Sequence, residues 1–463
     1  MNKKLFLLLL AIVLLHPHDV IGQICFTDYQ YLPVNSMPTY IVAADLNNDS
    51  LPDLVTASIE FNNMIAVYLN NGNRSFSLQE YYTPTNTPTQ ICIKDMNADN
   101  IPDMVVGMRY FGFDIFFGQG NGAFDSVMYY HTGYWTSAIV VEDFNSDSIP
   151  DVATTCTWDD SLRIYTGDSA GVFTFAGAYT SGGNTPTVIH QGDFNHDDIW
   201  DLAVLNSGDA GSGYRNVAVF MGVGSAQFDD PVIYTLNIDP TSLDVADFNM
   251  DSADDFVVGY SLYWPKLMFG NGDGTFDNSG YQDTVGLGTK SIFAGDVNMD
   301  GIPDLISPDR YVSVALGYGD GTFCTSVNLP SDYNYCAAYY GCMADFDRDG
   351  KNDLASVNQN AYEFEQPGKT VILYNCISIG FDENVSSGNV CVFPNPVADQ
   401  LSLSLSGSYA CDRIQIYNSM QQLVLDEPFT NGGINTKNLS PGIYFIQLFF
   451  NHNPVAQSKF IKT

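Results

Sequence analysis

The stretch DLNNDSLPDLV, residues 45–55, places three aspartates and an asparagine within nine residues and then runs into an apolar segment. Like charges this close repel one another, so some interaction must compensate the repulsion. The string begins again at Asp95, Asp143, Asp193, Asp247, Asp296 and Asp345, at intervals of 48 to 54 residues. All seven copies keep Asp at positions 1, 5 and 9, and position 3 is Asn except in the last copy, which has Asp347. This regularity indicates a repeat architecture.

Each repeat predicts four short β-strands. In the second copy they are residues 90–94, 103–107, 114–118 and 124–130, with the acidic loop after the first strand and a glycine-rich hairpin before the fourth. No segment shows helical periodicity. Four short strands in each repeat of this length are typical of propeller blades. We therefore expect an all-β fold, a seven-bladed β-propeller followed by a small β-sandwich domain.

The two ends of the repeat array predict how the ring closes. The seventh repeat stops after its third strand, residues 370–376, whereas residues 26–33 match the fourth strand of the other repeats. We expect this N-terminal strand to complete blade seven, so that the propeller spans residues 23–377. Cys25 and Cys376 then lie at the two ends of one hairpin, and we predict a disulfide between them.

The remaining propeller cysteines and the charge set further expectations. One more bridge is expected among Cys324, Cys336 and Cys342, and Cys92 is expected to be a buried free thiol. The formal net charge of −36 argues against nucleic acid or an anionic membrane as a partner. We expect a soluble monomer.

The N-terminus has the features of a secretory signal peptide. Lys3 and Lys4 precede an apolar run over residues 5–15, and we predict cleavage after Gly22. The run is too short for a comfortable membrane span, and no other stretch qualifies as one. Residues 1–22 are therefore expected to direct export.

The repeated pattern D-x-[ND]-x-D-x-x-x-D, with F-G-x-G-x-G-x-F downstream as in FFGQGNGAF, resembles the FG-GAP repeat. This repeat, also called VCBS, is the blade unit of integrin α-chain propellers and of many bacterial exported proteins. The resemblance covers about residues 25–376. It implies that each acidic loop binds Ca²⁺.

The chemistry of the loop supports the same ion independently. Side chains at positions 1, 3, 5 and 9 can converge with the carbonyl of position 7 on one hard cation, and three carboxylates disfavour a soft metal. We expect up to seven calcium ions, mainly structural. The predicted ligands are Asp45, Asn47, Asp49, Leu51 and Asp53 in the first loop; Asp95, Asn97, Asp99, Ile101 and Asp103 in the second; Asp143, Asn145, Asp147, Ile149 and Asp151 in the third; Asp193, Asn195, Asp197, Ile199 and Asp201 in the fourth; Asp247, Asn249, Asp251, Ala253 and Asp255 in the fifth; Asp296, Asn298, Asp300, Ile302 and Asp304 in the sixth; and Asp345, Asp347, Asp349, Lys351 and Asp353 in the seventh.

Two other interpretations of the loops make different demands on the sequence. An EF-hand requires Glu at position 12, where the first three loops have Thr56, Val106 and Thr154. An Asx-rich turn without an ion is the structural alternative. The fifth loop lacks proline at position 8 and is expected to bind calcium less tightly.

The opposite face of the propeller is predicted to hold the ligand site. The loops that join strands two to three and four to one emerge there, and they are rich in aromatic residues. The candidates are Tyr110, Trp135, Trp158, Trp264, Tyr335 and Tyr362. Exposed rings near a propeller mouth suit stacking on sugars or docking of a protein loop. The alternative is that the rings pack between blades or cover the core.

A second domain follows a polar linker at residues 378–390. Residues 391–463 alternate as β-strands without acidic loops. Pro394-Asn395-Pro396, IQIYNSMQQLV, LSPGIYFIQL and the basic end KFIKT resemble the type IX secretion sorting domain of Bacteroidota. The resemblance implies an exported bacterial protein, secreted or held at the cell surface, with the type IX secretion machinery as a partner. An accessory binding sandwich is the alternative, and Cys391 and Cys411 could staple this domain.

These observations lead to one functional expectation and two alternatives. We expect an exported calcium-binding β-propeller that acts in cell-surface adhesion or in recognition of an extracellular glycan or protein. The first alternative is a polysaccharide-degrading enzyme, a lyase or glycoside hydrolase, and the second is a purely structural surface protein. No catalytic constellation is convincing, because GDSAG at residues 167–171 lies in a glycine-rich hairpin and not at a strand-to-helix turn.

Overall fold

The chain divides into two compact units, each described by itself. In the computed structural model the first unit is Ile24–Cys376, and the second contains Met1–Gln23 and Ile377–Thr463. The described residues are 24–462 except 25, 35–36, 60–62, 209–213, 262, 279–290, 309–311, 325, 330–336, 360–367, 377–389, 394–399, 406–412, 419–422, 429–433, 441 and 451–452. The predicted signal peptide and nearly all of the predicted linker lie outside the described residues.

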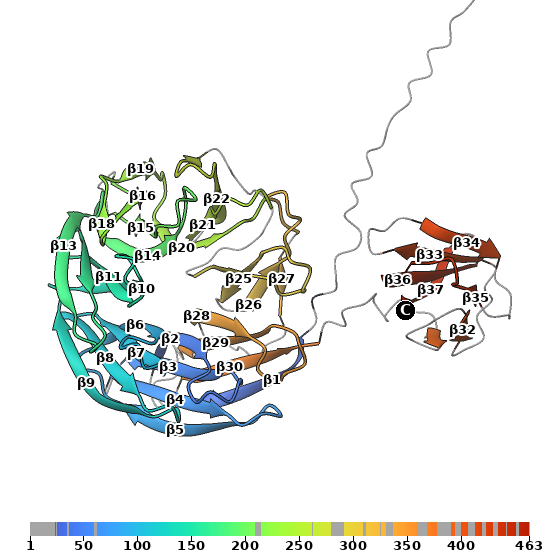
Figure 1. Ribbon diagram of the computed structural model, residues 1–463, viewed down its shortest axis with the longest axis horizontal. Coiled ribbons are helices and arrows are strands. Elements are labelled where there is room, and N and C mark those ends of the chain that lie inside the picture. The colour runs from blue at the N-terminus through green and yellow to red at the C-terminus, as the bar shows by residue number, and fades with distance from the viewer. Residues whose placement is uncertain are drawn as a thin grey trace, which may run out of the picture. The chain divides into compact units, whose positions relative to one another are not determined.

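The first unit is a ring of antiparallel sheets (Figure 1). Its described residues form seven four-stranded sheets, here called blades 1 to 7. Blade 1 contains β2 (Met37–Ala44), β3 (Asp53–Ile59), β4 (Met64–Asn70) and β5 (Phe76–Tyr82); blade 2 contains β6 (Pro88–Lys94), β7 (Asp103–Met108), β8 (Gly112–Gly118) and β9 (Phe124–His131); blade 3 contains β10 (Thr136–Glu142), β11 (Asp151–Cys156), β12 (Ser161–Thr166) and β13 (Thr174–Thr180); and blade 4 contains β14 (Pro186–Gly192), β15 (Asp201–Asn206), β16 (Asn216–Phe220) and β19 (Val232–Thr235), with a small hairpin of β17 (Gly222–Gly224) and β18 (Gln227–Phe228).

The remaining blades follow the same order. Blade 5 contains β20 (Pro240–Ala246), β21 (Asp255–Tyr260), β22 (Tyr263–Gly270) and β23 (Phe276–Asp277); blade 6 contains β24 (Phe293–Gly295), β25 (Asp304–Pro308), β26 (Val312–Ala315) and β27 (Val327–Asn328); and blade 7 contains β28 (Ala337–Ala344), β29 (Asp353–Gln359), β30 (Lys369–Asn375) and β1 (Phe26–Pro33). The first strand of each blade is the innermost, since β2 contacts β6 and β28, and β14 contacts β10 and β20. The predicted all-β propeller is confirmed.

The N-terminal strand closes the ring, as expected from the incomplete seventh repeat. β1 pairs antiparallel with β30, with Tyr31 opposite Val371. Arg74, in the β4–β5 hairpin of blade 1, joins the two sides of this closure. Its guanidinium lies 2.9 Å from Asp28 on β1 and 2.8 Å from Asp347 in the acidic loop of blade 7. The closure therefore combines sheet pairing with an ion-pair network.

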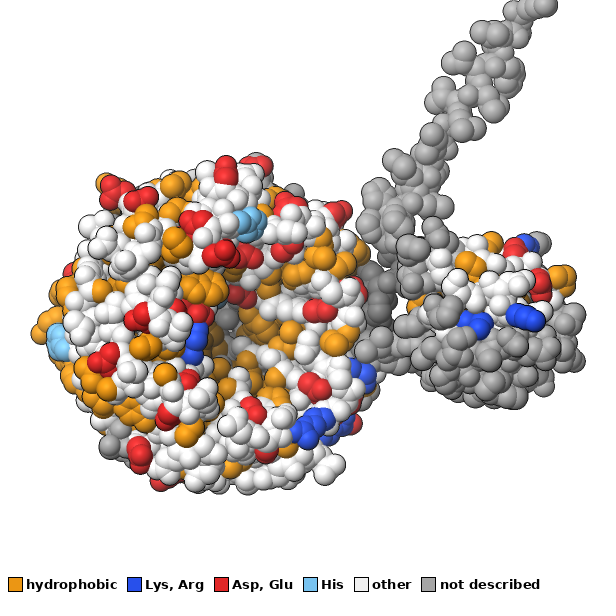
Figure 2. Space-filling view, in the orientation of Figure 1, with side chains coloured by type: hydrophobic (Ala, Val, Ile, Leu, Met, Phe, Trp, Pro, Cys, Tyr) orange, Lys and Arg blue, Asp and Glu red, His pale blue; other side chains and the backbone are white. Residues whose placement is uncertain are grey.

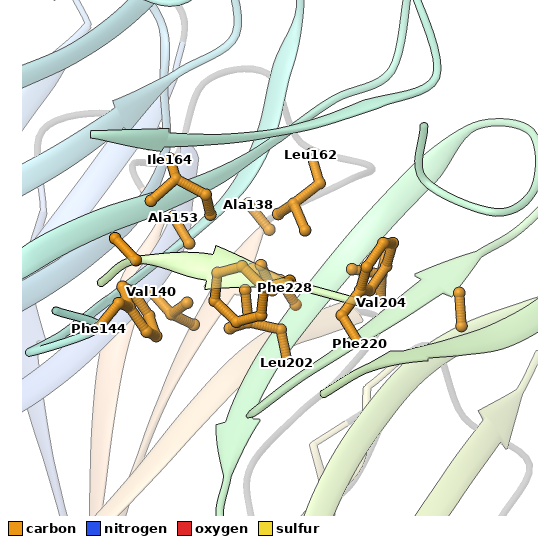
Figure 3. Packing of buried hydrophobic residues seen from close by; sticks show 13 residues of the cluster. Ala138, Val140, Phe144, Ala153, Leu162, Ile164, Leu202, Val204, Phe220 and Phe228 are labelled. Carbon is orange, nitrogen blue, oxygen red and sulfur yellow. The ribbon is translucent and has the colours of Figure 1, made fainter. Parts of the chain in front are cut away.

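The core lies between neighbouring blades. Every residue of β7 is buried, because its sheet is covered on both faces by adjacent sheets. Figure 3 shows one such seam, where Phe144 and Leu162 of blade 3 pack against Leu202 and Phe228 of blade 4. Strands covered on both faces are expected to be apolar throughout instead of alternating. This burial on both faces explains why the middle strands of the repeats have continuous apolar sequences.

In several blades the glycine-rich hairpin lies close to the preceding blade. Gly321 in blade 6 has φ +77°, and a Cβ added there would lie 2.3 Å from the Phe269 ring of blade 5. Gly122 of blade 2 makes the same approach to Leu69 of blade 1, at 2.4 Å. At these two positions glycine avoids both the strain of a left-handed backbone and the crowding that a side chain would cause.

A tyrosine on the outer strand reinforces four of the seams in the described residues. Tyr82 of blade 1 accepts a hydrogen bond on its hydroxyl from the Phe124 backbone N–H of blade 2, at 2.9 Å, and the two rings meet edge to face. Tyr130, Tyr179 and Tyr234 make the equivalent contact with Phe173, Phe228 and Phe276. Each pair buries a ring and satisfies a backbone donor at once.

The second unit is also built of strands. Its described residues form a three-stranded sheet of β31 (Val390–Phe393), β32 (Gln400–Leu405) and β35 (Ile434–Asn435), and a four-stranded sheet of β34 (Leu423–Pro428), β33 (Arg413–Asn418), β36 (Gly442–Phe450) and β37 (Asn453–Lys462). Strand β31 contacts β37, so the two sheets adjoin. No helix among the described residues of either unit is long and apolar enough to cross a membrane.

The cysteines agree with the sequence only in part. Cys376 is disulfide-bonded, whereas its predicted partner Cys25 lies outside the described residues. Cys92 is a free thiol, as predicted. The bridge predicted among Cys324, Cys336 and Cys342 is wrong, because Cys324 and Cys342 are both free. Cys342 lies on the innermost strand of blade 7, and the Cys324 sulfur instead accepts a hydrogen bond from the Leu316 N–H at 3.1 Å. The possible Cys391–Cys411 bridge falls outside what the structure describes.

A pair of glycine substitutions should separate backbone strain from crowding. Gly224→Ala places a Cβ in open space at φ +82°, and we expect a loss of about 1 kcal/mol. Gly321→Ala combines a similar φ with the contact to Phe269, so it should cost roughly 1–3 kcal/mol more. Urea unfolding of both variants in the same calcium buffer measures the difference. Equal losses would contradict the role given to the hairpin glycine.

Candidate calcium loops and the aromatic face

The seven acidic loops share one backbone conformation. Positions 4 and 6 have positive φ in every copy, from Asn48 and Ser50 in the first loop to Arg348 and Gly350 in the last. Left-handed conformations are uncommon for residues other than glycine, and bulky side chains such as Met250 occupy them here. The surrounding interactions must therefore hold this conformation in place.

The carboxylate at position 1 organises the loop from inside. In the third loop, Asp143 accepts the Asp147 N–H on Oδ1 at 3.1 Å and the Ser148 N–H on Oδ2 at 2.7 Å. The other six loops repeat both bonds, at 3.0–3.2 Å and 2.7–2.9 Å. The loop backbone therefore wraps around this carboxylate.

The aspartate at position 9 has a different role. Asp151 is fully buried at the start of β11, where Oδ2 accepts the Phe144 N–H at 3.0 Å and Oδ1 accepts the Gly167 N–H at 2.9 Å. The equivalent two bonds are present in every loop. One carboxylate thus ties the acidic loop to the end of the third strand of its own blade.

The residue at position 2 connects this arrangement to the next blade. It is a buried apolar residue in all seven loops: Leu46, Met96, Phe144, Phe194, Phe248, Val297 and Phe346. Its carbonyl accepts a hydrogen bond from the following blade at six of the seven seams among the described residues, from Gly122, Ala226, Gly274, Gly321, Asn375 and Asn70. The acidic loops are therefore part of the seams between blades.

Burial affects the charge of the position-9 carboxyl. Removal from water raises its pKa to about 6 in Asp53, Asp103, Asp151, Asp201 and Asp255, and to about 7 in Asp304 and Asp353. The backbone N–H bonds lower the pKa in part, and carboxylates within the same loop raise it again. A divalent cation beside these groups would favour the charged forms.

The predicted ligands fit a hard cation by their chemistry. Six loops offer carboxylate, amide and carbonyl oxygens and the seventh offers carboxylate and carbonyl oxygens, with no nitrogen or sulfur ligand among the predicted positions, and this is the donor set that calcium prefers. The loops hold these groups on one turn. In the seventh loop, one oxygen each of Asp345, Asp347 and Asp353 lies within 4.8 Å of the other two. Positions 1, 3, 5, 7 and 9 would supply the ligands.

In the seventh loop, two carboxylates form ion pairs with basic side chains. Asp347 pairs with Arg74 of blade 1 at 2.8 Å, and Asp349 pairs with Lys351 at 2.6 Å. The extra carboxylate at position 3 is thus matched by an arginine from across the closure. We expect this loop to depend less on a metal ion than the other six.

The structure brings part of the predicted ligand face together. Tyr110, Trp158 and Trp264 are exposed, and Trp135 is half-buried. Tyr335 and Tyr362 lie outside the described residues. Tyr110 lies in the β7–β8 turn, Trp135 in the β9–β10 connection and Trp158 in the β11–β12 turn, all at the strand ends opposite the acidic loops. Trp264 belongs to β22 of blade 5, away from the other three.

The structure has a central cavity that the sequence analysis did not predict. The innermost strands line a space of about 140 Å³, which includes Tyr40, Gln90, His190, Asp244 and Tyr340, and Figure 2 shows the ring hollowed near its middle. His190 Nδ1 lies 3.6 Å from Asp244 Oδ1. Aligning the repeats could have revealed these two residues, because the other blades have Val, Cys or Phe at the same position.

Comparison with known proteins supports the fold and the export signal. The profile of FG-GAP-like repeats matches residues 45–106 and 143–204, and the profile of the secretion system C-terminal sorting domain matches residues 391–463. The chain therefore carries FG-GAP-like repeats, and its sorting domain indicates export by type IX secretion to the cell surface or extracellular space. Both resemblances noted in the sequence are confirmed.

Solved structures agree on the architecture. The chain is similar to two crystal structures of BBS1N in complex with ARL6DN, one soaked with lead and one with mercury. Each has a TM-score of 0.51 at 12% identity; the alignments cover 75% and 76% of this chain and 96% of each matched chain. At this identity the likeness shows the β-propeller fold alone. No curated protein matches the chain.

Two isosteric substitutions in the third loop should distinguish binding of the ion from the structural role of position 9. Asp147→Asn retains an oxygen for the Ile149 N–H but removes an exposed charge, so we expect unchanged stability without calcium and affinity lower by roughly tenfold at one site. Asp151→Asn leaves a buried N–H facing an NH₂ group and should cost roughly 1–3 kcal/mol with or without calcium. Calcium calorimetry and melts with and without chelator measure both. Equal stability of the two variants in chelator would contradict the structural role given to position 9.

The inner-strand thiols should be inert in the native ring. Burial raises the pKa of Cys92 and of Cys342 to about 12, so almost no thiolate is present at pH 8. We expect iodoacetamide to leave both unmodified until the protein is unfolded, as read by peptide mass spectrometry. Free N-acetylcysteine under the same conditions is the reactivity control. Fast modification of the folded protein would mean that these strands open readily.

Proposed function

We propose that this exported propeller is a calcium-stabilised recognition module, which binds an extracellular ligand on its aromatic face. The observation that supports the proposal is that one acidic loop, with the same backbone conformation and only oxygen ligands, occurs seven times. Each loop contacts the seam to the next blade, so the free energy of calcium binding adds to the stability of the ring. The other ends of the strands are left free to carry varied loops.

The small volume of the central cavity favours a binding role over catalysis. His190 and Asp244 are the titratable pair that lines this cavity, and they would favour an enzyme, a lyase or glycoside hydrolase. The cavity around them, about 140 Å³, is smaller than the roughly 300 Å³ at which small-ligand sites begin. This volume is small for a polysaccharide chain. We therefore propose recognition, with the ligand outside this cavity.

Calcium analysis tests the first part of this proposal. Mature protein dialysed against calcium should retain close to seven ions per chain, and excess chelator should lower its melting temperature strongly. Elemental analysis and calorimetric melts give both values. Magnesium at the same concentration is the control, since it accepts this flexible geometry less readily. A chelator-insensitive melt together with no bound calcium would overturn the metal assignment.

Ligand screening tests the second part. Glycan and protein arrays probed with the calcium-loaded protein should give saturable binding, while reducing-end and unsaturated-product assays on the bound polysaccharides should give no turnover. Turnover would favour the enzyme. Absence of saturable binding on both arrays would favour a purely structural surface protein.

A further inference from the structure

We propose that the aromatic platform, defined here as Arg109, Tyr110, Phe111, Tyr134, Trp135 and Trp158, binds a neutral polysaccharide of pyranose units with equatorial hydroxyl groups. The inference rests on the proposed recognition function and specifies its site and ligand class. The platform joins two neighbouring blades. It combines the β7–β8 turn of blade 2 with the β9–β10 connection and the β11–β12 turn that frame blade 3.

The rings of the platform are displayed to solvent. Trp158 is 75% exposed, Tyr134 58% and Tyr110 38%. Large aromatic side chains are usually buried to a greater extent, and a group of exposed rings marks an interaction site. The explanation that these rings only cover the core does not apply to them.

The rings contact one another in a continuous row. Tyr110 meets Trp135 at 5.7 Å between ring centroids, and Phe111 meets Tyr134 at 4.8 Å. Tyr134 lies 6.4 Å from Trp158, and Tyr110 lies 6.3 Å from Phe111. Neighbouring ring planes are inclined to one another by 44–64°, so the row offers successive, differently oriented stacking positions to an extended chain of sugars. Tyrosine and tryptophan also supply polar edges.

The backbone beneath the row is held in a costly conformation. Phe111 has φ +75° and Trp135 has φ +63°, values that bulky residues rarely adopt. The Phe111 carbonyl accepts hydrogen bonds from the Tyr129 hydroxyl at 2.8 Å and the Thr132 N–H at 3.0 Å. The Trp135 carbonyl accepts the Thr157 N–H at 2.9 Å. Such positions cluster at binding sites, where a fixed geometry lowers the entropy lost on binding.

Arg109 supplies open hydrogen-bond donors beside the rings. Its guanidinium lies 4.3 Å from the centroid of the Trp135 ring, and no carboxylate of the described residues pairs with it. By contrast, Arg163 of blade 3 pairs with Asp159 next to Trp158. Stacked on Trp135, Arg109 retains donors directed at solvent, and sugar hydroxyl oxygens are suitable acceptors for them.

The charge of the chain selects a neutral ligand. The net charge of −36 repels a polyanion, and Asp159 and Asp160 follow Trp158 directly. A pyranose with equatorial hydroxyls has flat faces of axial C–H groups that can lie on the exposed rings, while its edge accepts hydrogen bonds. β-Linked glucans and xylans have this geometry, whereas polyuronates add a repelled carboxylate to each unit.

The test is affinity electrophoresis of the calcium-loaded full chain through gels containing hydroxyethyl cellulose, xylan or polygalacturonate. We expect retardation by one of the neutral polymers and at least a tenfold loss of affinity in Trp158→Ala. Phe175→Ala, which removes an exposed ring of the outer strand β13, should stay within twofold of the wild type, and Trp264→Ala, on the same face of blade 5, tests whether the ligand binds away from the platform. Melting curves show that each variant is folded.

Each outcome decides between this site and the broader proposal. Retardation that survives Trp158→Ala but is lost in Trp264→Ala overturns the platform while leaving recognition by the aromatic face. Stronger retardation by polygalacturonate overturns the neutral ligand class. If no polysaccharide retards the wild type but a protein array gives saturable binding, this inference fails and the recognition function stands. Failure on every probe, arrays included, overturns both.

Discussion

The buried carboxylate at position 9 is the constraint on which the ring depends. It sits at the start of the second strand of each blade and accepts backbone N–H groups from the acidic loop and from the end of the third strand. A buried aspartate is costly unless its oxygens are satisfied, so the two strands and the loop are fixed relative to one another. Because position 2 of the same loop fills the next seam, this local bond also sets how neighbouring blades meet.

The two ends of the strands therefore serve different purposes. At the acidic end, seven loops repeat one conformation, including residues that disfavour it, because each must satisfy the same buried carboxylate and the same seam. At the opposite end no such condition applies, and the turns differ in length and composition from blade to blade. The acidic loop at the closure, in blade 7, departs from the repeated sequence. It has Asp347 in place of asparagine, and Arg74 of blade 1 compensates the added charge. A binding surface can vary at one end without loosening the ring.

Most of the fold could be predicted from the sequence because the period repeats seven times. The predicted strands of blade 2 begin and end within two residues of β6 to β9, and the N-terminal strand closes blade 7. The site could be predicted less fully. The sequence predicts position 9 only as a metal ligand. Its structural role could not be predicted, because it depends on hydrogen bonds to backbone N–H groups elsewhere in the blade. Side-chain burial also could not be predicted from position near a loop: Tyr260, at the end of β21 beside an aromatic-rich turn, packs in the core between blades 4 and 5.

The seam beneath the aromatic platform shows why stability and recognition are linked in this chain. Between blades 2 and 3 the described residues show no hydrogen bond from blade 3 to the position-2 carbonyl of Met96, whereas the other six seams have one from a backbone N–H or an asparagine side chain. Tyr130 replaces it: its hydroxyl accepts the Phe173 N–H and donates to the Gly171 carbonyl, both at 3.3 Å. This seam is thus held largely by side chains, directly under the two blades that share the platform. Ions that fix the acidic loops on either side would keep the row of rings aligned, whereas a loosened seam would separate Tyr110 from Trp158 without unfolding either blade.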